Sequence, residues 1–549
     1  MPLRTTTQNN YSVAQRHRPN WQWSNTVTYA MSFGKSRLNL LAGMEAVKNQ
    51  TRVVQVQRLG YAVEDQDYYT ISSGTGVVTS QENILENQLV SYFGQVGYAF
   101  NDKYLLNATV RYDGSSRFGR NNQFGLFPAG SIGWAISKES FMQNGLPIVS
   151  NLKLRVGYGR VGNQEFGNYG ALTFFRTNYG TVTSTRPTGT AYDINAANTG
   201  TLPSGYVLSQ TGNPDLKWET TDEFNAGVDF GFAHQKITGS FDYFHRNTSG
   251  ILITPPVSAV RGEGATKTVN GATVENQGFE FLIAYNDSKG DFTYGIEANA
   301  ARFMDKVTYL PPTVVRSYPS NAEKTIIGHS MNSVLGYVAD GLFKTQEEVD
   351  AHAVQAGKGV GRIKYKDLNG DGKIDPLDQD WLGTTLPGFT YGINLTAGYK
   401  RFSLSIFTRG VAFINVNDGN IGITDFFGTL TGVNHGTRLL NAWTPQNPNS
   451  DIPAASNGDA NTETKTSTYL RVRGDYFKVQ DIQLDYRLPL AKWKLTAARI
   501  YVIADNTLLF FNKNGGTGMN KPFTGPDPET PGTTYPRPIR FTLGLDFKF

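Results

Sequence analysis

Hydrophobic and polar residues alternate along many segments of the chain, with the period of two that places successive side chains on opposite faces of a strand. The pattern fills residues 104–111, 223–230 and 292–300, and it runs to the last residue. At that end, the apolar positions are Phe541, Leu543, Leu545, Phe547 and Phe549. Long strands with one apolar and one polar face suit a sheet that has lipid on one side and water on the other. The sequence therefore predicts an all-β fold, a transmembrane antiparallel β-barrel, with the last nine residues as its closing strand and barrel-assembly signal.

The expected connections between strands also alternate, between short turns and long polar loops. Turns are expected near 101–102, 233–235, 286–290, 400–401 and 488–492. Long loops are expected at 112–125, 161–217, 247–276, 307–386, 414–469 and 512–536. Short turns on one rim and long loops on the other are typical of outer-membrane barrels. The count of segments predicts about 16 strands.

Composition limits the other function classes. Only 39% of the 549 residues are hydrophobic, and no apolar run approaches the roughly 18 residues of a membrane helix. The absence of cysteine excludes disulfide scaffolds, thiolate metal sites and cysteine nucleophiles. A net charge of +5 that is spread along the chain does not indicate a nucleic-acid-binding surface. The six histidines are scattered and no nucleophile elbow or phosphate loop occurs, so we expect no enzymatic activity.

The N-terminal sequence lacks the apolar segment of an export signal. Because an outer-membrane barrel must be exported, we expect residues 1–549 to be a fragment of a longer protein.

Several motifs resemble those of the SusC/RagA-like TonB-dependent transporters of the Bacteroidetes outer membrane. They are Arg111-Tyr-Asp-Gly-Ser-Ser-Arg-Phe118, Leu154-Arg-Val-Gly-Tyr-Gly-Arg-Val-Gly-Asn163, Gly212-Asn-Pro-Asp-Leu-Lys-Trp-Glu-Thr220, Tyr365-Lys-Asp-Leu-Asn-Gly-Asp-Gly372 and Tyr469-Leu-Arg-Val-Arg473. The resemblance spans almost the whole chain. It implies part of a 22-stranded barrel that imports oligosaccharides or peptides, driven by the TonB complex and closed by a SusD-like surface lipoprotein. The plug domain, the TonB-binding segment and the early strands have no match here, so the resemblance covers the C-terminal barrel portion only.

One motif has the spacing of a calcium-binding loop. Oxygen ligands are expected from Asp367, Asn369, Asp371, the Lys373 carbonyl, Asp375 and Asp378. Glycine at the sixth position allows the sharp turn, but aspartate replaces the usual glutamate at the twelfth. The alternative is a solvated Asp/Asn/Gly turn without metal. We expect a structural calcium ion, within a long loop that also carries a short helix beginning after the N-cap Thr345.

Two further groups of residues have expected roles in the barrel. On the expected polar face of the strands, Glu223, Asn225, Asp229, Glu297 and Asn299 would face the lumen and line the wall against the plug. In the loops, aromatic rings can stack on sugars, and the candidates are Tyr169, Phe174, Tyr179, Tyr192, Tyr318, Trp443 and Tyr535. Loop-to-loop packing is the alternative for each of these rings.

The sequence leaves three functions open. The first is the barrel portion of an energy-coupled importer that works with a SusD-like lipoprotein and the TonB complex. The second is a passive outer-membrane porin or surface adhesin. The third is a secreted, calcium-stabilised soluble β-protein.

Overall fold

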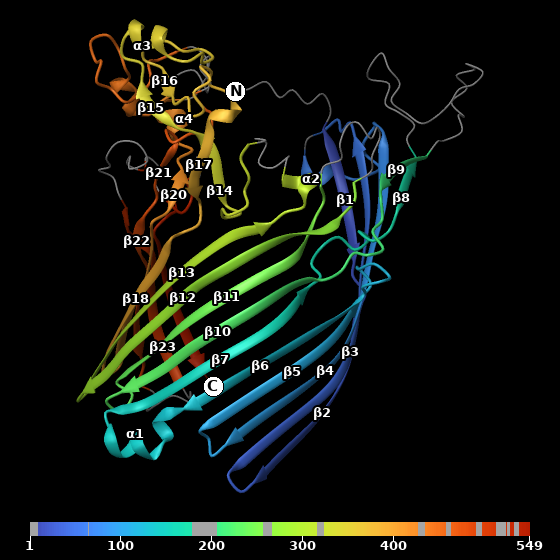
Figure 1. Cartoon of the computed structure of the whole chain (residues 1–549), viewed down its shortest axis with the longest axis vertical. Helices are drawn as coiled ribbons and strands as arrows, with labels where there is room; N and C mark the ends of the chain where they lie inside the picture. The colour runs from blue at the N-terminus through green and yellow to red at the C-terminus, as the bar shows by residue number, and fades with distance from the viewer. Residues whose placement is uncertain are drawn as a thin grey trace. The chain divides into compact units, whose positions relative to one another are not determined.

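The computed structural model of the chain describes residues 9–63, 65–177, 206–255, 266–315, 323–426, 434–456, 463–489, 497–511, 523, 527–531 and 537–548. Figure 1 shows their arrangement as strands with few helices. Among these residues, no helix is long and apolar enough to cross a membrane.

A single sheet of 16 strands dominates the fold. Both β1 and β2 pair with β3, and the order continues β3-β4-β5-β6-β7-β10-β11-β12-β13-β18-β19-β22-β23-β24. The strands are β1 Asn10–His17, β2 Asn20–Phe33, β3 Ser36–Leu59, β4 Val78–Phe100, β5 Tyr104–Ser115, β6 Phe124–Ala135, β7 Val149–Asn163, β10 Glu219–Phe232, β11 Ile237–Ile253, β12 Val269–Lys289, β13 Phe292–Tyr309, β18 Phe389–Tyr399, β19 Phe402–Ala412, β22 Tyr476–Arg487, β23 Ala497–Phe511 and β24 Arg540–Lys548.

The connecting segments contain short elements. Four two-stranded ribbons pair β8 Phe174–Thr177 with β9 Tyr206–Gln210, β14 Ser333–Tyr337 with β17 Gln379–Thr384, β15 Ala339–Leu342 with β16 Ile363–Tyr365, and β20 Asn415–Asn417 with β21 Arg471–Arg473. The helices are α1 Ser140–Gly145, α2 Pro312–Val315, α3 Gln346–Ala351, α4 Ile421–Thr424, η1 Gln66–Tyr68, η2 Ile136–Lys138, η4 Pro376–Asp378 and η5 Thr437–Asn441.

The chain divides into two compact units. The first comprises Met1–Ile132, Tyr158–Asp222 and Thr248–Ala272, and the second comprises Gly133–Gly157, Glu223–Asn247 and Thr273–Phe549.

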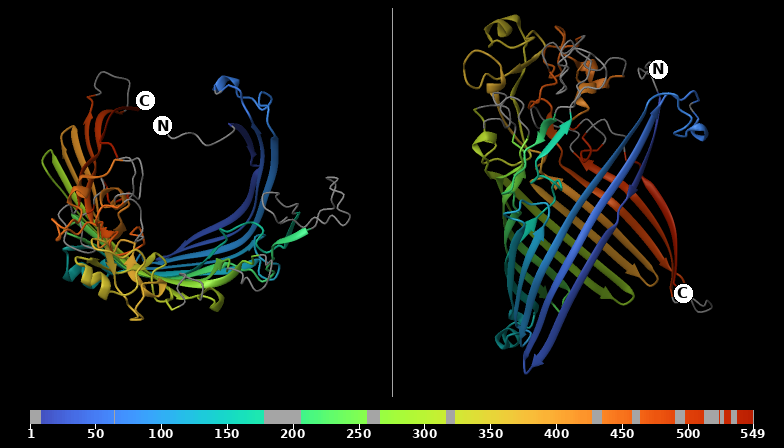
Figure 2. Two further views of the ribbon diagram at one scale, coloured as in Figure 1. Left: turned by 90° about the horizontal axis from the view of Figure 1, so that it is seen from above. Right: turned by 90° about the vertical axis from the view of Figure 1, so that its right-hand side faces the viewer.

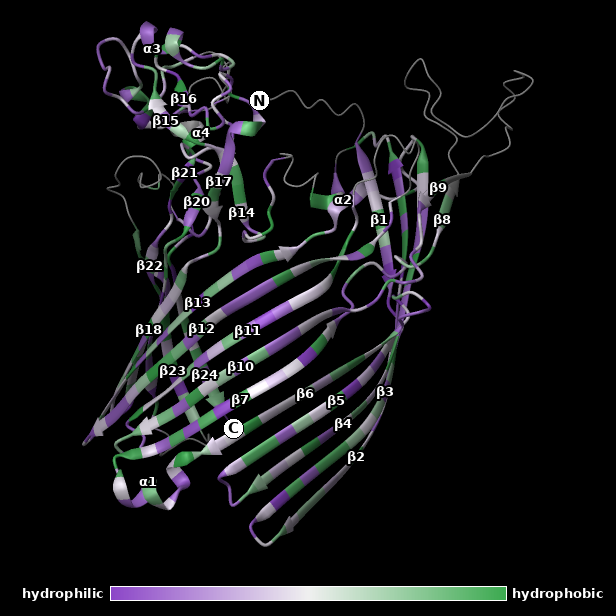
Figure 3. Ribbon diagram, in the orientation of Figure 1, coloured by the Kyte–Doolittle hydropathy of each residue, from purple (hydrophilic) through white to green (hydrophobic). Residues whose placement is uncertain are grey.

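In the first unit, strand register separates an apolar from a polar face. Tyr29 pairs with Leu40, Leu40 with Val96, and Val96 with Ala108, so these four side chains share one face. Residues one position along each strand fall on the other face, which is mostly polar. Figure 2 shows β2–β5 as long neighbouring strands, and Figure 3 shows the alternation of hydrophobic and hydrophilic residues along them.

Aromatic residues lie near both ends of this apolar face. One row contains Phe100 and Tyr104, and the other contains Tyr92 and Tyr112. Phe100 lies eight positions after Tyr92. This is roughly 26 Å along the strand and roughly 20 Å after a tilt of about 40°. This height is close to the apolar band of an outer-membrane barrel, which is about 25 Å tall and has aromatic girdles at both rims.

Proline interrupts the first strand without changing its register. His17 of β1 pairs with Arg52, and Asn20 of β2 pairs with Asn49, so both strands follow the same alignment on β3. Between them, Pro19 has no amide hydrogen to donate to the ladder. Within the described sheet this pair of strands has only β3 as a neighbour, which is the position at which a strand tolerates proline.

Three of the short turns lie where the sequence places them, in the part of the chain that the structure describes. The turn expected at 286–290 is shorter, because β12 continues to Lys289. Asn101 and Asp102 join β4 to β5 with φ of 53° and 54°, a left-handed conformation that Asn and Asp adopt more readily than most residues. Ala233, His234 and Gln235 also have positive φ, as does Lys400. The expected turn at 488–492 lies partly outside the described residues.

The strands are longer than the sequence predicts. β11 continues to Ile253 and β12 begins at Val269, so both enter the expected loop 247–276. Likewise, β5 continues to Ser115. The sequence analysis also missed the connection between β3 and β4, which contains η1. Polar residues in these strand extensions form ladders as readily as apolar ones, because the backbone supplies the hydrogen bonds.

We predict that charge on the apolar face destabilises the protein in lipid, whereas the same charge on the polar face does not. Val96→Arg should lower the free energy of unfolding by about 2–4 kcal/mol, the cost of arginine at the middle of a bilayer. The adjacent Gln95→Arg is the matched control, because its side chain lies on the opposite face. Urea titration of both variants in lipid vesicles would measure their free energies of unfolding. Equal losses of stability in the two variants would contradict this register.

Candidate functional site

The polar face of the second unit carries ion pairs between neighbouring strands. Arg246 of β11 donates from Nε to Glu223 of β10 at 2.8 Å. Arg155 of β7 binds Asp229 through two nitrogens at 2.9 and 2.8 Å, and it also binds Asp242 at 3.0 Å. Each pair keeps a charged side chain satisfied at a half-buried position.

The remaining predicted lumen-facing residues share this polar face. Asn394 donates to Glu297 at 3.0 Å. Asn299 pairs with Gly392, and a Cβ added to this glycine would meet the Asn299 side chain. Asn225 lies at an alternate position of β10 from Glu223 and is half-buried, whereas the intervening Phe224 is exposed. These positions agree with the predicted alternation, and their contact with a lumen stays a prediction.

Two of the recognised motifs pack together in the first unit. Phe118, Phe127, Leu216 and Trp218 form one buried cluster, with the rings of Phe118 and Trp218 4.8 Å apart. Trp218 Nε1 donates to the Gln123 carbonyl at 2.9 Å. The segments around residues 118 and 216 are therefore joined by an aromatic core, which sequence inspection of either motif alone could not show.

Backbone contacts fix the same junction. Gly119 N donates to the Leu216 carbonyl at 2.9 Å. Asn121 Nδ2 donates to Asp215 at 2.8 Å, and Asn122 Nδ2 donates to the Asp215 carbonyl at 3.0 Å. A Cβ added to Gly119 would overlap the Pro214 carbonyl, so glycine is required by this close approach.

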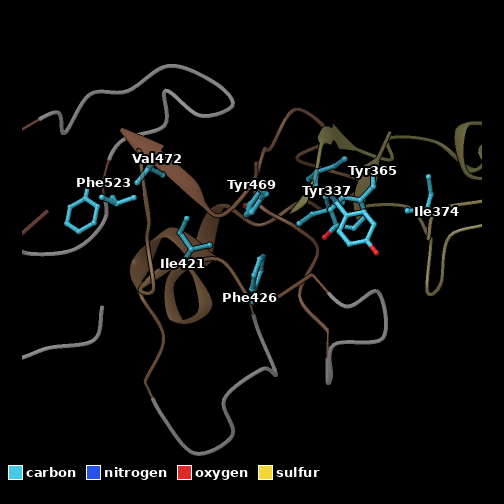
Figure 4. Close-up of a cluster of buried hydrophobic side chains, with 11 residues drawn as sticks. Tyr337, Tyr365, Ile374, Ile421, Phe426, Tyr469, Val472 and Phe523 are labelled. Atoms are coloured by element: carbon cyan, nitrogen blue, oxygen red, sulfur yellow. The ribbon is translucent and has the colours of Figure 1, made fainter. Parts of the chain in front are cut away.

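In the second unit, three connecting segments fold into one module, which we call the loop module. It comprises the described residues of the β13–β18, β19–β22 and β23–β24 connections. Figure 4 shows its core, in which these residues are buried: Tyr337, Leu342, Ile363, Tyr365, Ile374, Val416, Ile421, Phe426, Tyr469, Val472 and Phe523. Because the core draws from all three connections, each one helps to order the others.

Buried polar contacts reinforce the loop module. Tyr469 donates its hydroxyl to Asp425 at 3.0 Å, and Arg438 holds the same carboxylate at 2.9 and 3.1 Å. Burial and the neighbouring carboxylate raise the pKa of Tyr469 well above its usual value, so it remains a hydrogen-bond donor.

Arg471, from the Tyr469–Arg473 motif, is fully buried between two connections. Its Nη2 donates to the Thr384 carbonyl at 3.1 Å and to the Asn415 carbonyl at 3.2 Å. Within the described residues, its Nε has no hydrogen-bond partner. Burial lowers the pKa of its guanidinium group. The motif therefore supplies a buried arginine that links two connections, rather than an exposed binding residue.

The calcium-type loop is closed by hydrogen bonds to its own backbone. Asp367 accepts from the amides of Gly370 and Gly372 at 2.7 and 2.9 Å, and Asp371 accepts from Lys373 at 2.9 Å. The fully buried Asp378 accepts from the amides of Leu368 and Asp375.

The other two predicted side-chain ligands make the same kind of contact. Asn369 accepts from the Asp371 amide at 3.0 Å, and Asp375 accepts from Leu377 at 2.8 Å. Across the described residues, no group of three or more His, Cys, Asp or Glu side chains is arranged to hold a metal ion. The calcium ion stays a prediction.

The helix predicted in this loop is present but shorter than expected. It is α3, Gln346–Ala351, and Thr345 caps it by accepting from the Glu348 amide at 3.3 Å. Glu348 in turn accepts from the Lys344 amide, one residue before the cap.

The aromatic candidates differ in their surroundings. Tyr169 accepts from the Glu86 amide at 2.8 Å and packs edge-on against Phe174, 6.0 Å away. Phe174 is 39% exposed at the start of β8. Trp443 packs against the core of the loop module. The other four candidates, Tyr179, Tyr192, Tyr318 and Tyr535, lie outside the described residues, as does Phe549. Substrate contact by these rings stays a prediction.

Comparison with known proteins identifies the family. The family described as "TonB dependent receptor-like, beta-barrel" matches residues 2–417, about three quarters of the chain. The chain belongs to this family. Its members are outer-membrane β-barrel transporters rather than enzymes, which confirms the predicted fold class and the outer-membrane localisation.

Individual relatives agree with this assignment. TonB-dependent receptor P26 of Formosa agariphila is 28% identical over 98% of this chain and 54% of its own length. TonB-dependent receptor SusC of Bacteroides thetaiotaomicron is 28% identical over 84% of this chain and 44% of its own length. The chain thus spans about half the length of the curated relatives it matches.

The fold is also that of a solved transporter. The structure of the RagAB peptide transporter matches with a TM-score of 0.79, over 100% of this chain and 57% of that chain, at 22% identity. The resemblance to SusC/RagA-like transporters drawn from the sequence motifs is confirmed.

We predict that the junction between the two aromatic motifs depends on Gly119. Gly119→Ala should weaken it by roughly 1–3 kcal/mol, because the new methyl group has no space beside Pro214. Hydrogen exchange of the Gly119 and Leu216 amides would report the local opening. Gly145→Ala is the control, because a Cβ there meets no atom within 4 Å. Unchanged protection at both amides would contradict the prediction.

Proposed function

We propose that this chain is the C-terminal barrel portion of a SusC-like, TonB-dependent importer of oligosaccharides or peptides. In the whole transporter, a SusD-like lipoprotein closes the extracellular side, and the TonB complex supplies energy through a plug domain that is not part of these strands. The loop module is the observation that carries the proposal. Three connections with a shared core provide a broad, ordered surface for cargo and lipoprotein, which a simple diffusion pore does not need.

The polar face of the sheet supports the same proposal. Glu223, Asn225, Asp229, Glu297 and Asn299 would line the lumen, where cross-strand pairs such as Arg246–Glu223 keep the wall charged and hydrated. The loops also contribute to cargo selection, because binding residues are often carried on loops that a rigid scaffold positions.

We predict that uptake requires both proton-motive force and the lipoprotein. Cells that depend on this transporter should lose uptake of labelled oligosaccharide or peptide pools when its gene is deleted, when a protonophore is added, or when the gene of its SusD-like lipoprotein is removed. A passive porin would lose uptake only on deletion of its own gene. Uptake that persists with the protonophore would therefore favour the porin over the importer.

We further propose that the loop 367–378 binds calcium with a structural role. Its support is the ligand spacing in the sequence and the positive φ of Gly370 and Gly372, 75° and 80°, which allows the sharp turn of a calcium-binding loop. Carboxylate and amide oxygens that already accept one hydrogen bond retain a lone pair for a hard cation.

We predict that calcium stabilises this loop. At a calcium concentration 100 times the dissociation constant, local stability should rise by about 2.7 kcal/mol, and a chelator should remove the gain. Hydrogen exchange or proteolysis at Lys366 and Lys373 would measure it. Asp371→Ala should abolish the response, whereas Asp350→Ala in α3 should not. A loop equally protected with calcium and with chelator would show that its own hydrogen bonds suffice.

A further inference from the structure

A nearly buried carboxylate lies between the connection that follows β23 and the wall of the sheet. The Glu529 side chain is only 7% exposed. It accepts from the Tyr476 hydroxyl at 2.7 Å and from Lys478 Nζ at 3.0 Å. Arg409 also donates to it, and Arg537 Nη1 lies 3.4 Å from it. Four donors thus converge on one carboxylate.

Without Glu529, the strands of the sheet would hold two positive charges side by side. Arg409 of β19 and Lys478 of β22 are direct cross-strand partners, so both cations lie on the same face. Like charges at directly opposite positions destabilise a sheet. Arg409 also donates to the Tyr476 hydroxyl at 3.0 Å, which completes a set of donors on two adjacent strands. This arrangement needs an anion, and in the structure the anion is Glu529.

The segment that carries Glu529 is shaped to present it. Asp527 accepts from the Glu529 amide at 2.9 Å, and its carbonyl accepts from the Thr530 amide at 3.1 Å. The hydrogen bonds from Tyr476 and Lys478 outweigh burial and lower the pKa of Glu529, so its carboxylate is charged. Glu529 therefore behaves as a tethered anionic ligand.

The cationic site is not fully covered by Glu529. The side chains of Arg409 and Arg537 are 47% and 48% exposed. Three cations, Arg409, Lys478 and Arg537, form ion pairs with two carboxylates, Asp527 and Glu529. An arriving anion would find two guanidinium groups accessible before Glu529 moves.

We propose that Arg409, Tyr476, Lys478 and Arg537 form a binding site for carboxylate groups of the cargo, and that Glu529 is an internal ligand which the cargo carboxylate displaces. The proposal rests on the proposed function, since it assigns this polar face to the path of the cargo. Guanidinium and ammonium groups form strong charge-assisted hydrogen bonds with carboxylates, which uncharged sugars cannot replace. The chemical class is a carboxylate, supplied by a uronate sugar or by a peptide.

A tethered competitor weakens the apparent affinity for free cargo. The effective concentration of a group on a short flexible linker is in the millimolar range, so Glu529 competes with any weak carboxylate ligand. Removal of its charge should therefore expose the site. Because charge-assisted hydrogen bonds contribute about 1.5–3 kcal/mol, Glu529→Gln should tighten carboxylate binding roughly tenfold or more.

The test is calorimetric titration of the protein purified from the outer membrane in detergent. The probes are a galacturonate trimer against maltotriose, and a tripeptide with a free C-terminus against its amide. Glu529→Gln should bind at least one carboxylate probe about tenfold tighter than the unmodified protein, with no change for either neutral probe. The galacturonate trimer and the tripeptide represent the two sources of carboxylate, so the one whose binding tightens identifies the source. Arg409→Gln, added to Glu529→Gln, should remove the gain.

Glu82→Gln is the matched control. It also neutralises a glutamate that pairs with an arginine of the neighbouring strand, Arg52, but leaves the four donors of the proposed site unchanged. It should leave all four affinities unchanged. Equal tightening in both variants would mean a general electrostatic effect and would overturn the proposal, as would equal binding of carboxylate and neutral probes to Glu529→Gln.

A measurement on the unmodified protein keeps the test independent of folding defects in the variants. Saturating the protein with the carboxylate probe should increase hydrogen exchange at the Glu529 and Thr530 amides. The reason is that the displaced turn loses its contacts with Tyr476 and Lys478. Maltotriose should not increase this exchange. Unchanged exchange at saturation would overturn displacement. Since neither readout involves uptake, a protein that binds carboxylates but imports nothing would refute the proposed function and leave this site intact.

Discussion

The register of the long antiparallel strands is the constraint on which the rest of the structure depends. Side chains alternate between the two faces, so a shift of one residue would exchange the apolar and polar sets of a whole strand. In β2–β5, the pairing of Leu40 with Val96 places both side chains on one face. The residues one position along each strand, which are mostly polar, lie on the other face. Backbone pairing satisfies the peptide groups, which is the condition for crossing lipid with strands.

Once register is fixed, the connections must be ordered by other means. The structure uses buried aromatic cores in both units. Trp218 and Phe118 join two motifs that lie about a hundred residues apart, and the loop module combines three connections around Tyr469 and its neighbours. Long loops cost conformational entropy, and a shared core offsets that cost for several segments at once. Residues of the family motifs therefore serve as structural junctions, with Arg471 as the clearest example.

Sequence alone predicts what depends on local periodicity and on short motifs. The alternation in 223–230 and 292–300 located parts of β10 and β13, and left-handed turns such as Asn101–Asp102 were readable from composition. Strand ends were not, because polar residues pair as well as apolar ones in an extended ladder. The partnership of Arg409 with Glu529 was also out of reach, since 120 positions separate them and neither belongs to a recognisable motif. Trp443 shows the same limit, because it packs against a core whose residues come from three separate connections.

The ion pairs of the polar face differ in kind from the cluster around Glu529. The ion pairs belong to the wall of the sheet, whereas the cluster around Glu529 has the features of a binding site. Arg246 and Glu223 come from neighbouring strands, and each neutralises the other without help from a loop. Arg409 and Lys478 are both cations on neighbouring strands, so the wall is incomplete until an anion arrives from outside it. If the only role of the sheet were to span a membrane, opposite charges could occupy the positions of Arg409 and Lys478 and pair directly across the two strands. Retaining two cations there, and covering them with a carboxylate on a connection, is the arrangement of a binding site that holds its own substitute ligand.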